Sequence, residues 1–283
     1  MTSTEESFEE PEEFAELNPD DLTVADLTTA EKATELLRLH TAPQLLKLVN
    51  VWDVITAQVV AATPGTKALA TASHSIAAAH GYPDGEQIPR VLMIDAVARI
   101  AASVKLPVTA DLEAGYGDVG ETISRAIDVG VVGANLEDQL KPLPEAVRAV
   151  SDAVEAGERA GVGFVLNART DAFLRGADRD PKAVLADAIE RGRAYLDAGA
   201  ACFFVPGKLD EPTVGALVEA LGRGRISVIA VPGSLSLERL EQLGVARVSY
   251  GPYSQNVALT ALAELTESVY AGGELPASMR RLN

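Results

Sequence analysis

The 283-residue sequence predicts an α/β fold, a closed (β/α)₈ barrel. Short β-rich runs recur eight times along the chain, helical patterns lie between them, and the helical stretches end in glycine before the next run. Glycine suits a helix C-terminus because it adopts the left-handed conformation at little cost. Eight alternating β and α units in about 250 residues are typical of such a barrel.

The predicted strands are apolar at consecutive positions, as Phe203–Val205 and Val228–Val231 illustrate. This pattern is typical of parallel strands that are covered on both faces. A doubly wound open sheet is the alternative, but no G-x-G-x-x-G follows the first strand, which weakens a dinucleotide-binding version. We expect the eight strands within residues 45–53, 63–73, 104–115, 128–139, 159–173, 197–207, 222–233 and 242–252.

Amphipathic helical patterns separate these strands, with clear examples at residues 144–161 and 181–199 and a further one at 256–272 after the last strand. Pro144 and Pro181 stand in a first helical turn, where the missing N–H of proline is tolerated. We therefore expect one barrel domain over residues 31–283.

The acidic residues are concentrated at the N-terminus. Residues 1–31 contain eleven Asp and Glu side chains and no Lys or Arg, so they carry −11 of the net charge of −17. We expect residues 1–30 to form an acidic, partly disordered extension that aids solubility, with a specific docking role as the alternative. Because a negative field repels phosphates, a nucleic-acid partner is not expected.

The sequence also argues against a membrane or secretory protein. No apolar run approaches the roughly 20 residues of a membrane span, and the acidic N-terminus lacks the basic and apolar regions of a signal peptide. The single cysteine, Cys202, cannot form an internal disulfide, which fits a reducing cytoplasm. Because it lies in the apolar run ACFFV, we interpret it as a core thiol.

Acidic residues stand where the predicted strands end, which is the catalytic face of a barrel. Asp111 and Glu113 are two residues apart, so we expect them on the same side of a strand, and Glu137 and Asp138 end the next strand. Crowded carboxylates stay ionised only with a cation among them. Oxygen donors without a His or Cys cluster favour Mg²⁺, with Mn²⁺ as the alternative ion. A solvated loop with ordinary turn chemistry is the competing interpretation.

Other strand ends supply candidate substrate-binding residues. The planar guanidinium of Arg169 suits a carboxylate or phosphate, and a salt bridge to Asp171 or Glu137 is its alternative role. His74 is a candidate ligand or proton-transfer group, although a lone histidine is more often simply polar. The remaining candidates are Trp52, Ala72, Ser73, Asn135 and Asn167.

Over residues 45–265 the sequence resembles the isocitrate lyase / phosphoenolpyruvate mutase superfamily. The resemblance rests on the ordered motifs NVWD, ALATASHSIAAAHGYPDGE, ADLEAGYGD, GANLEDQ, NARTDAF and RVSYGP. It implies a (β/α)₈ barrel, a homodimer or homotetramer in which the last helix is exchanged between subunits, bound Mg²⁺, and small 2-oxo or hydroxy carboxylate substrates, with phosphonates in some members.

The resemblance also implies roles for site residues. Asp111 matches the direct metal ligand of the family, and Arg169 matches the arginine that binds the substrate carboxylate. The turn from Ala72 to His74 matches a backbone nest for the same group, although His74 stands where small or apolar residues are more usual. The carboxylates that would hold the metal through water are Glu113, Glu137 and Asp84.

One loop departs from the family pattern. Carbon–carbon lyases of the isocitrate type carry Lys-Cys-Gly-His after the acidic pair of the fourth strand, whereas this chain has DQLKPLPEA, without Cys or His. The phosphonate mutases carry a Lys and an Asn in a gating loop there, and this loop is short with only Lys141. The sequence thus resembles the branch often labelled carboxyvinyl-carboxyphosphonate phosphorylmutase.

These patterns favour an Mg²⁺-dependent lyase or decarboxylase that acts on an oxaloacetate-like 2-oxo acid through a metal-stabilised enolate. Such a reaction needs no nucleophilic cysteine. One alternative is a carbon–phosphorus mutase or hydrolase for substrates of the phosphonopyruvate or carboxyphosphonoenolpyruvate type. The other, from a different class, is a non-catalytic barrel that binds a carboxylate.

Overall fold

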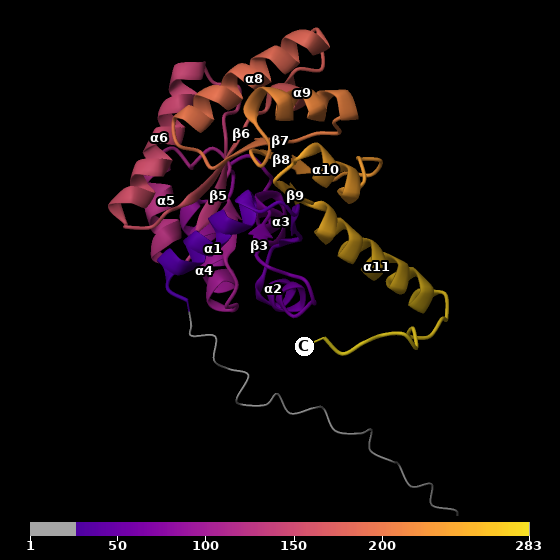
Figure 1. Cartoon of the computed structure of the whole chain (residues 1–283). Helices are drawn as coiled ribbons and strands as arrows, with labels where there is room; N and C mark the ends of the chain where they lie inside the picture. The colour runs from indigo at the N-terminus through magenta and orange to yellow at the C-terminus, as the bar shows by residue number, and fades with distance from the viewer. Residues whose placement is uncertain (1–26, 283) are drawn as a thin grey trace, which may run out of the picture.

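The computed structural model describes residues 27–282 and confirms the predicted α/β barrel (Figure 1). Its nine strands are all parallel and follow the order β1-β9-β8-β7-β6-β5-β4-β3-β2, which makes a nearly closed barrel. Most of the predicted acidic extension lies outside the described residues. The first helix begins at Thr29, after the capping residue Thr28.

The strands are β1 Leu46–Leu48, β2 Asn50–Val51, β3 Leu69–Thr71, β4 Val108–Asp111, β5 Gly133–Glu137, β6 Val165–Arg169, β7 Cys202–Val205, β8 Ile226–Ile229 and β9 Arg247–Ser249. The helices are α1 Thr29–Thr41, α2 Val54–Ala61, α3 Ser73–Ala79, α4 Arg90–Ala102, α5 Val119–Asp128, α6 Leu143–Arg159, α7 Ala172–Arg175, α8 Pro181–Asp197, α9 Glu211–Leu221, α10 Leu237–Leu243 and α11 Tyr253–Tyr270.

The first predicted strand closes the barrel in two pieces. β1 pairs with β9 through Leu46 and Arg247, whereas β2 pairs with β3 through Asn50 and Ala70. The chain leaves the regular strand at Val49, between the two pieces. The eight predicted runs therefore form nine strands without any change in the predicted topology.

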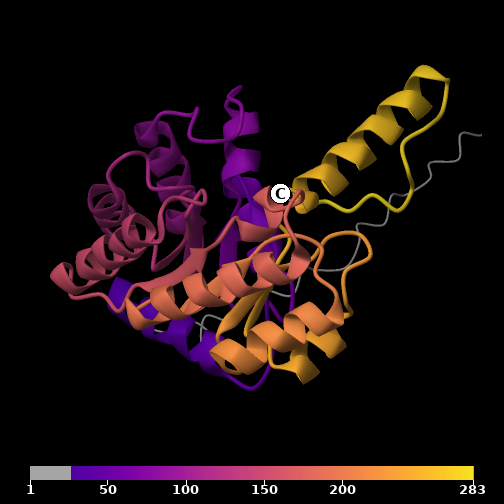
Figure 2. The same ribbon diagram turned by 90° about the horizontal axis from the view of Figure 1, so that it is seen from above.

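Helices surround the barrel on its outside (Figure 2). The predicted helical stretches 144–161 and 181–199 are confirmed as α6 and α8, each with proline at its first turn. Helix α1 packs directly on the strands at Gly133, where a Cβ atom would lie 2.6 Å from the Val165 carbonyl oxygen and 2.9 Å from Leu36 Cδ2. Only glycine allows this close approach.

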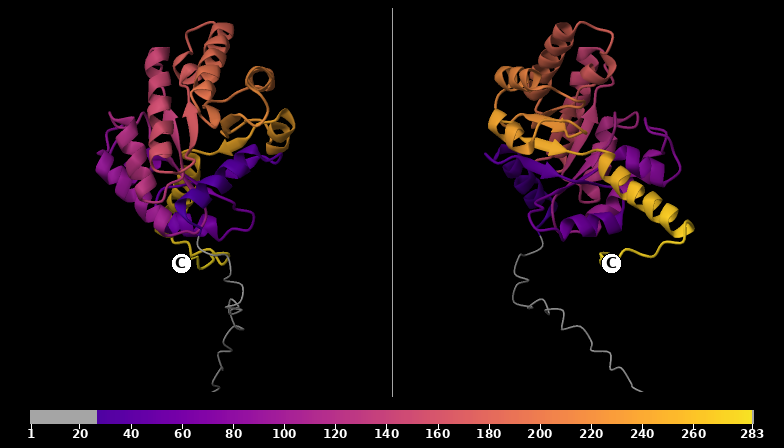
Figure 3. Two further views of the ribbon diagram at one scale, coloured as in Figure 1. Left: turned by 60° about the vertical axis from the view of Figure 1, so that its left-hand side comes forward. Right: turned by 90° about the vertical axis from the view of Figure 1, so that its right-hand side faces the viewer.

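The last helix, α11, projects away from the barrel (Figure 3). Its only buried residue is Gln255, whose side chain donates a hydrogen bond to the Ser75 carbonyl at 3.1 Å. The apolar side chains that α11 leaves exposed are Val257, Leu259, Leu262, Val269 and Tyr270. The predicted helix at 256–272 is thus confirmed, and its exchange between subunits stays a prediction. Across residues 27–282, none of the helices combines the length and the apolar character that crossing a bilayer requires.

Candidate active site

A cavity of about 260 Å³ opens at the carboxyl ends of the strands. Its lining is divided by strand: the charged residues come from β4, β6 and the segment that follows β3, and most of the apolar residues come from β7, β8 and the segment after β9. The polar lining consists of Asn50, Ser73, His74, Asp84, Asp111, Asn135, Arg169 and Ser249, with Ala72 beside them. The apolar lining consists of Leu174, Phe204, Pro206, Ile229, Val231, Pro252 and Tyr253.

Asp111 ends β4 and lines this cavity. Its Oδ2 accepts hydrogen bonds from the Ser73 amide at 3.1 Å and from the Ser73 hydroxyl at 2.7 Å. Its own N–H donates to Thr71 Oγ1 at 3.0 Å, which fixes the end of the strand. The amide of Ser73 is therefore engaged by Asp111, so the turn at Ala72–His74 does not present a fully free backbone nest.

Glu113 does not line the cavity beside Asp111, and the expected alternation of side chains fails here. β4 ends at Asp111, and Glu113 has a left-handed φ of 50°, so the two-residue period of a strand no longer applies. The buried Glu113 carboxylate accepts hydrogen bonds from the Tyr116 hydroxyl at 2.7 Å and from the Glu86 amide. Burial raises the pKa of Glu113 despite these bonds, and the charges of Asp111 and Asp84 raise it further.

Arg169 is held between two carboxylates, so both of its alternative salt bridges form. Nη1 lies 2.8 Å from Glu137 Oε2, and Nη2 lies 2.8 Å from Asp171 Oδ1. Burial raises the pKa of Glu137 to about 7, although the Arg169 charge lowers it; the charges of Asp171, Asp111 and Glu113 add to the increase. A carboxyl with this pKa can take up or release a proton near neutral pH.

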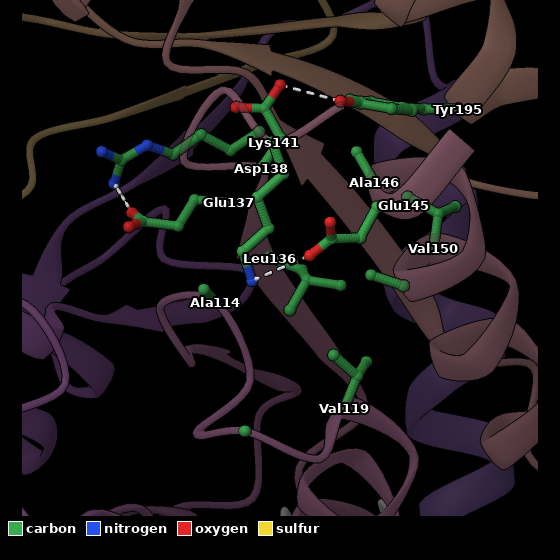
Figure 4. Close-up of a pocket in the computed structure, with 13 residues that line it drawn as sticks. Ala114, Val119, Leu136, Glu137, Asp138, Lys141, Glu145, Ala146, Val150 and Tyr195 are labelled. Atoms are coloured by element: carbon green, nitrogen blue, oxygen red, sulfur yellow. Dashed lines mark hydrogen bonds and ion pairs between the residues drawn. The ribbon is translucent and has the colours of Figure 1, made fainter. Parts of the chain in front are cut away.

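Asp138 is a structural residue, and neither Asp138 nor Glu137 lines this cavity. Its Oδ2 accepts a hydrogen bond from the Tyr195 hydroxyl at 2.7 Å and lies 3.1 Å from Arg191 Nη1. Figure 4 shows the two carboxylates diverging, with Asp138 directed toward Tyr195. The Glu137 carboxylate pairs with Arg169, whereas the Asp138 carboxylate is held by Tyr195 and Arg191, so the acidic pair does not converge on one ion.

The floor of the cavity is an amide pair. Asn135 lines the cavity, and its Oδ1 accepts a hydrogen bond from Asn167 Nδ2 at 2.8 Å. Asn167 is fully buried and also donates to Ser227 Oγ at 3.3 Å, so it supports the floor without reaching the cavity. Of these two predicted substrate-binding residues, only Asn135 is positioned to touch a ligand.

The structure separates the remaining candidates. His74 lines the central cavity, whereas Trp52 lines a different surface groove together with His80 and Asp95. Cys202 is confirmed as a core thiol, because it is fully buried. Burial raises its pKa to about 12, so the thiol is un-ionised near neutral pH. The sequence had suggested neither a ligand nor a catalytic role for it.

Lys141 lies in a smaller side cavity of about 90 Å³ between β5, α6 and α8 (Figure 4). Its Nζ is 3.9 Å from Glu145 Oε1, and it does not line the central cavity. Glu137 and Arg169 also line this side cavity, and Arg169 lines the central cavity too. Their ion pair therefore stands between the two cavities.

The oxygen donors fit a hydrated divalent ion better than a closed carboxylate cage. Within residues 27–282, no group of three His, Cys, Asp or Glu side chains is arranged to hold one ion. Mg²⁺, however, usually keeps several waters and takes only one or two carboxylates. Asp111 and Asp84 line one cavity, and their charges raise the pKa of Glu113, a repulsion that a cation would relieve.

Sequence reasoning missed several residues of the site. Asn50 lines the cavity, and its Oδ1 accepts hydrogen bonds from the Tyr250 and Gly251 amides at 2.7 and 2.8 Å. A polar residue inside the apolar run LKLVNV was its signal. The apolar lining was missed because single Leu, Phe and Ile residues at strand ends look like ordinary core. Nothing in the sequence indicated the role of Glu86, whose carboxylate accepts a hydrogen bond from the Tyr116 amide and so holds the loop after β4.

Comparison with known proteins agrees with this architecture. Residues 36–270 match the family model described as phosphoenolpyruvate phosphomutase. An uncharacterized protein of Mycobacterium tuberculosis is 32% identical over 234 residues, which cover 82% of this chain and 87% of the relative. A Burkholderia cenocepacia protein provisionally assigned as a phosphonomutase is 43% identical, with a TM-score of 0.79 over 84% of this chain and 99% of the other.

A further solved structure, oxaloacetate acetylhydrolase in complex with its product oxalate, is 25% identical with a TM-score of 0.79. The similarity covers 90% of this chain and 92% of that one. The family model spans most of the described residues, and the barrel with its strand-end carboxylates matches the motifs found in the sequence. The chain belongs to the isocitrate lyase / phosphoenolpyruvate mutase superfamily, whose members include lyases and mutases.

Proposed function

We propose that this protein is a divalent-metal-dependent lyase or decarboxylase that cleaves a small, oxaloacetate-like 2-oxo carboxylate. The observation that carries the proposal is the division of the cavity lining, with charged groups gathered on one group of strands and apolar groups on another. The similarity to oxaloacetate acetylhydrolase supports the same substrate class.

Arg169 retains hydrogen-bond donors for the 2-oxo carboxylate end, or 2-oxo head, of such a substrate. A guanidinium has five N–H groups. Nε and one Nη2 donor face Asp171, and one Nη1 donor faces Glu137, which leaves one N–H on each terminal nitrogen. These two donors are available to a carboxylate at the cavity wall. Asn135 adds an amide donor, because its Oδ1 is already engaged by Asn167.

Asp111 would hold Mg²⁺ or Mn²⁺, with Asp84, which lines the same cavity, acting through water. Glu113 and Glu137 do not line the cavity, but their charges interact with that of Asp111, so they would contribute from a greater distance. When bound, the cation would supply Lewis-acid stabilisation of the negative charge that develops on the keto oxygen. Arg169 and Asn135, which belong to the chain itself, would bind and orient the 2-oxo head.

The apolar part of the lining favours cleavage of the C3–C4 bond of the substrate. With the 2-oxo head at Arg169, the C4 carboxylate of an oxaloacetate-like substrate would extend toward Phe204 and Ile229. Arg169 is the only Lys or Arg side chain among the described residues that line this cavity, so the C4 carboxylate would lose hydration without gaining a cation. The C3–C4 electron pair then passes to the enolate, CO₂ leaves, and His74 is the group we assign to return a proton to C3.

A carbon–phosphorus mutase or hydrolase is the second candidate. The matched family model and the Burkholderia cenocepacia relative favour it. Phosphoryl transfer would require a positively charged side chain that can reach the transferred group. Lys141 instead lies in the side cavity near Glu145. Replacing Lys141 by alanine therefore separates the two reactions, because decarboxylation should keep most of its rate and phosphoryl transfer should not.

The full chain should be assayed with Mg²⁺ against a panel of 2-oxo acids and phosphonopyruvate, with CO₂, pyruvate and phosphate measured as products. We expect turnover of an oxaloacetate-like acid, abolished by EDTA and reduced roughly 100-fold by Asp111→Asn. Turnover of phosphonopyruvate alone would favour the second candidate. Tight Mn²⁺ and oxalate binding without any turnover would favour a non-catalytic carboxylate-binding barrel.

We also propose that the chain forms a homodimer or homotetramer in which α11 is exchanged between subunits. The supporting observation is that α11 touches its own barrel through its first turn and leaves its apolar side chains exposed, with Leu262 at 58% and Val257 at 71%. Exposed apolar surface of this extent is typical of an interaction site.

A further inference from the structure

Arg247 is a fully buried arginine inside the barrel, on β9. It is 1% exposed, and no carboxylate of residues 27–282 forms an ion pair with it. Its Nη2 donates to Asn135 Oδ1 at 3.1 Å, while Nε and Nη1 have no partner among the described residues. A buried cation without an opposite charge is costly, so its presence calls for a role.

The groups around Arg247 do not neutralise it. His40 Nδ1 lies 2.8 Å from the Leu36 carbonyl, which can only accept, so the ring proton is on Nδ1. Burial, together with the Arg247 charge, lowers the pKa of His40 to about 3, so the ring is neutral near pH 7. Burial keeps the neighbouring Cys202 thiol protonated. Arg247 itself remains charged, since burial lowers its pKa only to about 10.

Arg247 lies one residue away from the active-site cavity. Asn135 Oδ1 accepts from both Arg247 Nη2 and Asn167 Nδ2, which fixes the carbonyl side of the amide toward the core. The Nδ2 group of Asn135, which lines the cavity, is thereby left as a donor to a ligand. The charge of Arg247 also acts on the site, because it interacts with that of Asp111.

We propose that Arg247 is a positioning and specificity-determining residue: it fixes the Asn135 amide as a donor, and its unpaired charge favours an anionic ligand in the cavity while opposing the divalent cation. The inference rests on the proposed anionic 2-oxo ligand. It differs from a purely structural role because it predicts effects of opposite sign on anion and cation binding.

The test uses Arg247→Met, which keeps an unbranched side chain with an apolar stem but shortens it and removes the charge and the hydrogen bond. Isothermal titration calorimetry would measure Mn²⁺ alone, and then oxalate in saturating Mn²⁺. We expect oxalate affinity to fall by about tenfold or more and Mn²⁺ affinity to rise by about tenfold, as loss of one nearby buried charge implies. Cys202→Ala, at a neutral neighbour of Arg247, is the matched control and should change neither affinity.

Equal losses of both affinities, with a lowered melting temperature, would show a structural role and overturn the inference. If wild type binds Mn²⁺ but not oxalate, the proposed function fails, and tighter Mn²⁺ binding by Arg247→Met would still support the charge effect. Unchanged Mn²⁺ affinity in a folded Arg247→Met protein would overturn that effect.

A crystal structure of wild type with Mn²⁺ and oxalate provides a test that does not depend on a variant. We expect Asn135 Nδ2 within about 3 Å of an oxalate oxygen while Oδ1 stays on Arg247. An Asn135 amide that turns away from oxalate would overturn the positioning role.

Discussion

Glu137 and Arg169 lie in register on neighbouring strands, with Glu137 Oε2 2.8 Å from Arg169 Nη1. The pair stands between the central cavity and the side cavity, and both partners are largely buried. The substrate arginine is therefore also part of a buried ion pair, and the ionisation of Glu137 bears on both stability and activity.

The raised pKa of Glu137 predicts a pH-dependent loss of stability. Its folded-state pKa is about 7, above the ordinary value of 4.5, so ionisation of Glu137 destabilises the fold increasingly as the pH rises between these values. The shift corresponds to about 3 kcal/mol of unfolding free energy. We expect the stability of Glu137→Gln relative to wild type to rise between about pH 5 and pH 8, as measured by urea unfolding without divalent ions. Parallel pH profiles for the two proteins would contradict this prediction.

Arg169→Lys should impair catalysis without abolishing metal binding. Lysine keeps the charge but loses the planar fork that binds a carboxylate with two donors, so kcat/KM for the 2-oxo acid should fall by roughly 100-fold or more. Arg175→Lys is the matched control, since Arg175 also contacts Asp171, at 3.3 Å, but is largely exposed outside the cavity. Equal kinetic effects of the two variants would argue that Arg169 only holds Asp171.

Asp138→Asn should destabilise the fold while Mn²⁺ affinity stays unchanged. The change removes a buried charge that pairs with Arg191 and accepts a hydrogen bond from Tyr195, and breaking such a buried ion pair costs about 3 kcal/mol or more. Urea unfolding and Mn²⁺ calorimetry would be compared on the same preparation. A lost Mn²⁺ site with unchanged stability would instead identify Asp138 as a metal ligand.

Leu262→Glu should dissociate the assembly that we propose. A charge among the exposed apolar side chains of α11 would be buried in an exchanged arrangement, where it would have no partner, but would be tolerated in the free helix. Size-exclusion chromatography with light scattering should show a dimer or tetramer for wild type and a monomer for the variant. Glu267→Lys, on the same helix, controls for a general effect of charge change. A monomeric wild type would refute the exchange.

The local pattern of the chain was sufficient to predict the barrel and its helices. Consecutive apolar residues, helix-ending glycines and first-turn prolines act within a few residues of one another, so they are visible in the sequence. The same holds for Asp111, Asn135 and Arg169, which reach the cavity because each lies within the last residues of a regular strand.

Only the tertiary structure decided which of these side chains meet. Glu113 lies beyond the end of β4, where a left-handed backbone turns it toward Tyr116, and Asp138 points outward to Arg191. In the sequence, Arg247 is simply one cation in an apolar strand. Its lack of a carboxylate partner depends on β5, β7 and α1, which are distant along the chain. Periodicity fixes the direction of a side chain only while the strand continues, and a charge finds its partners through the packing of distant segments.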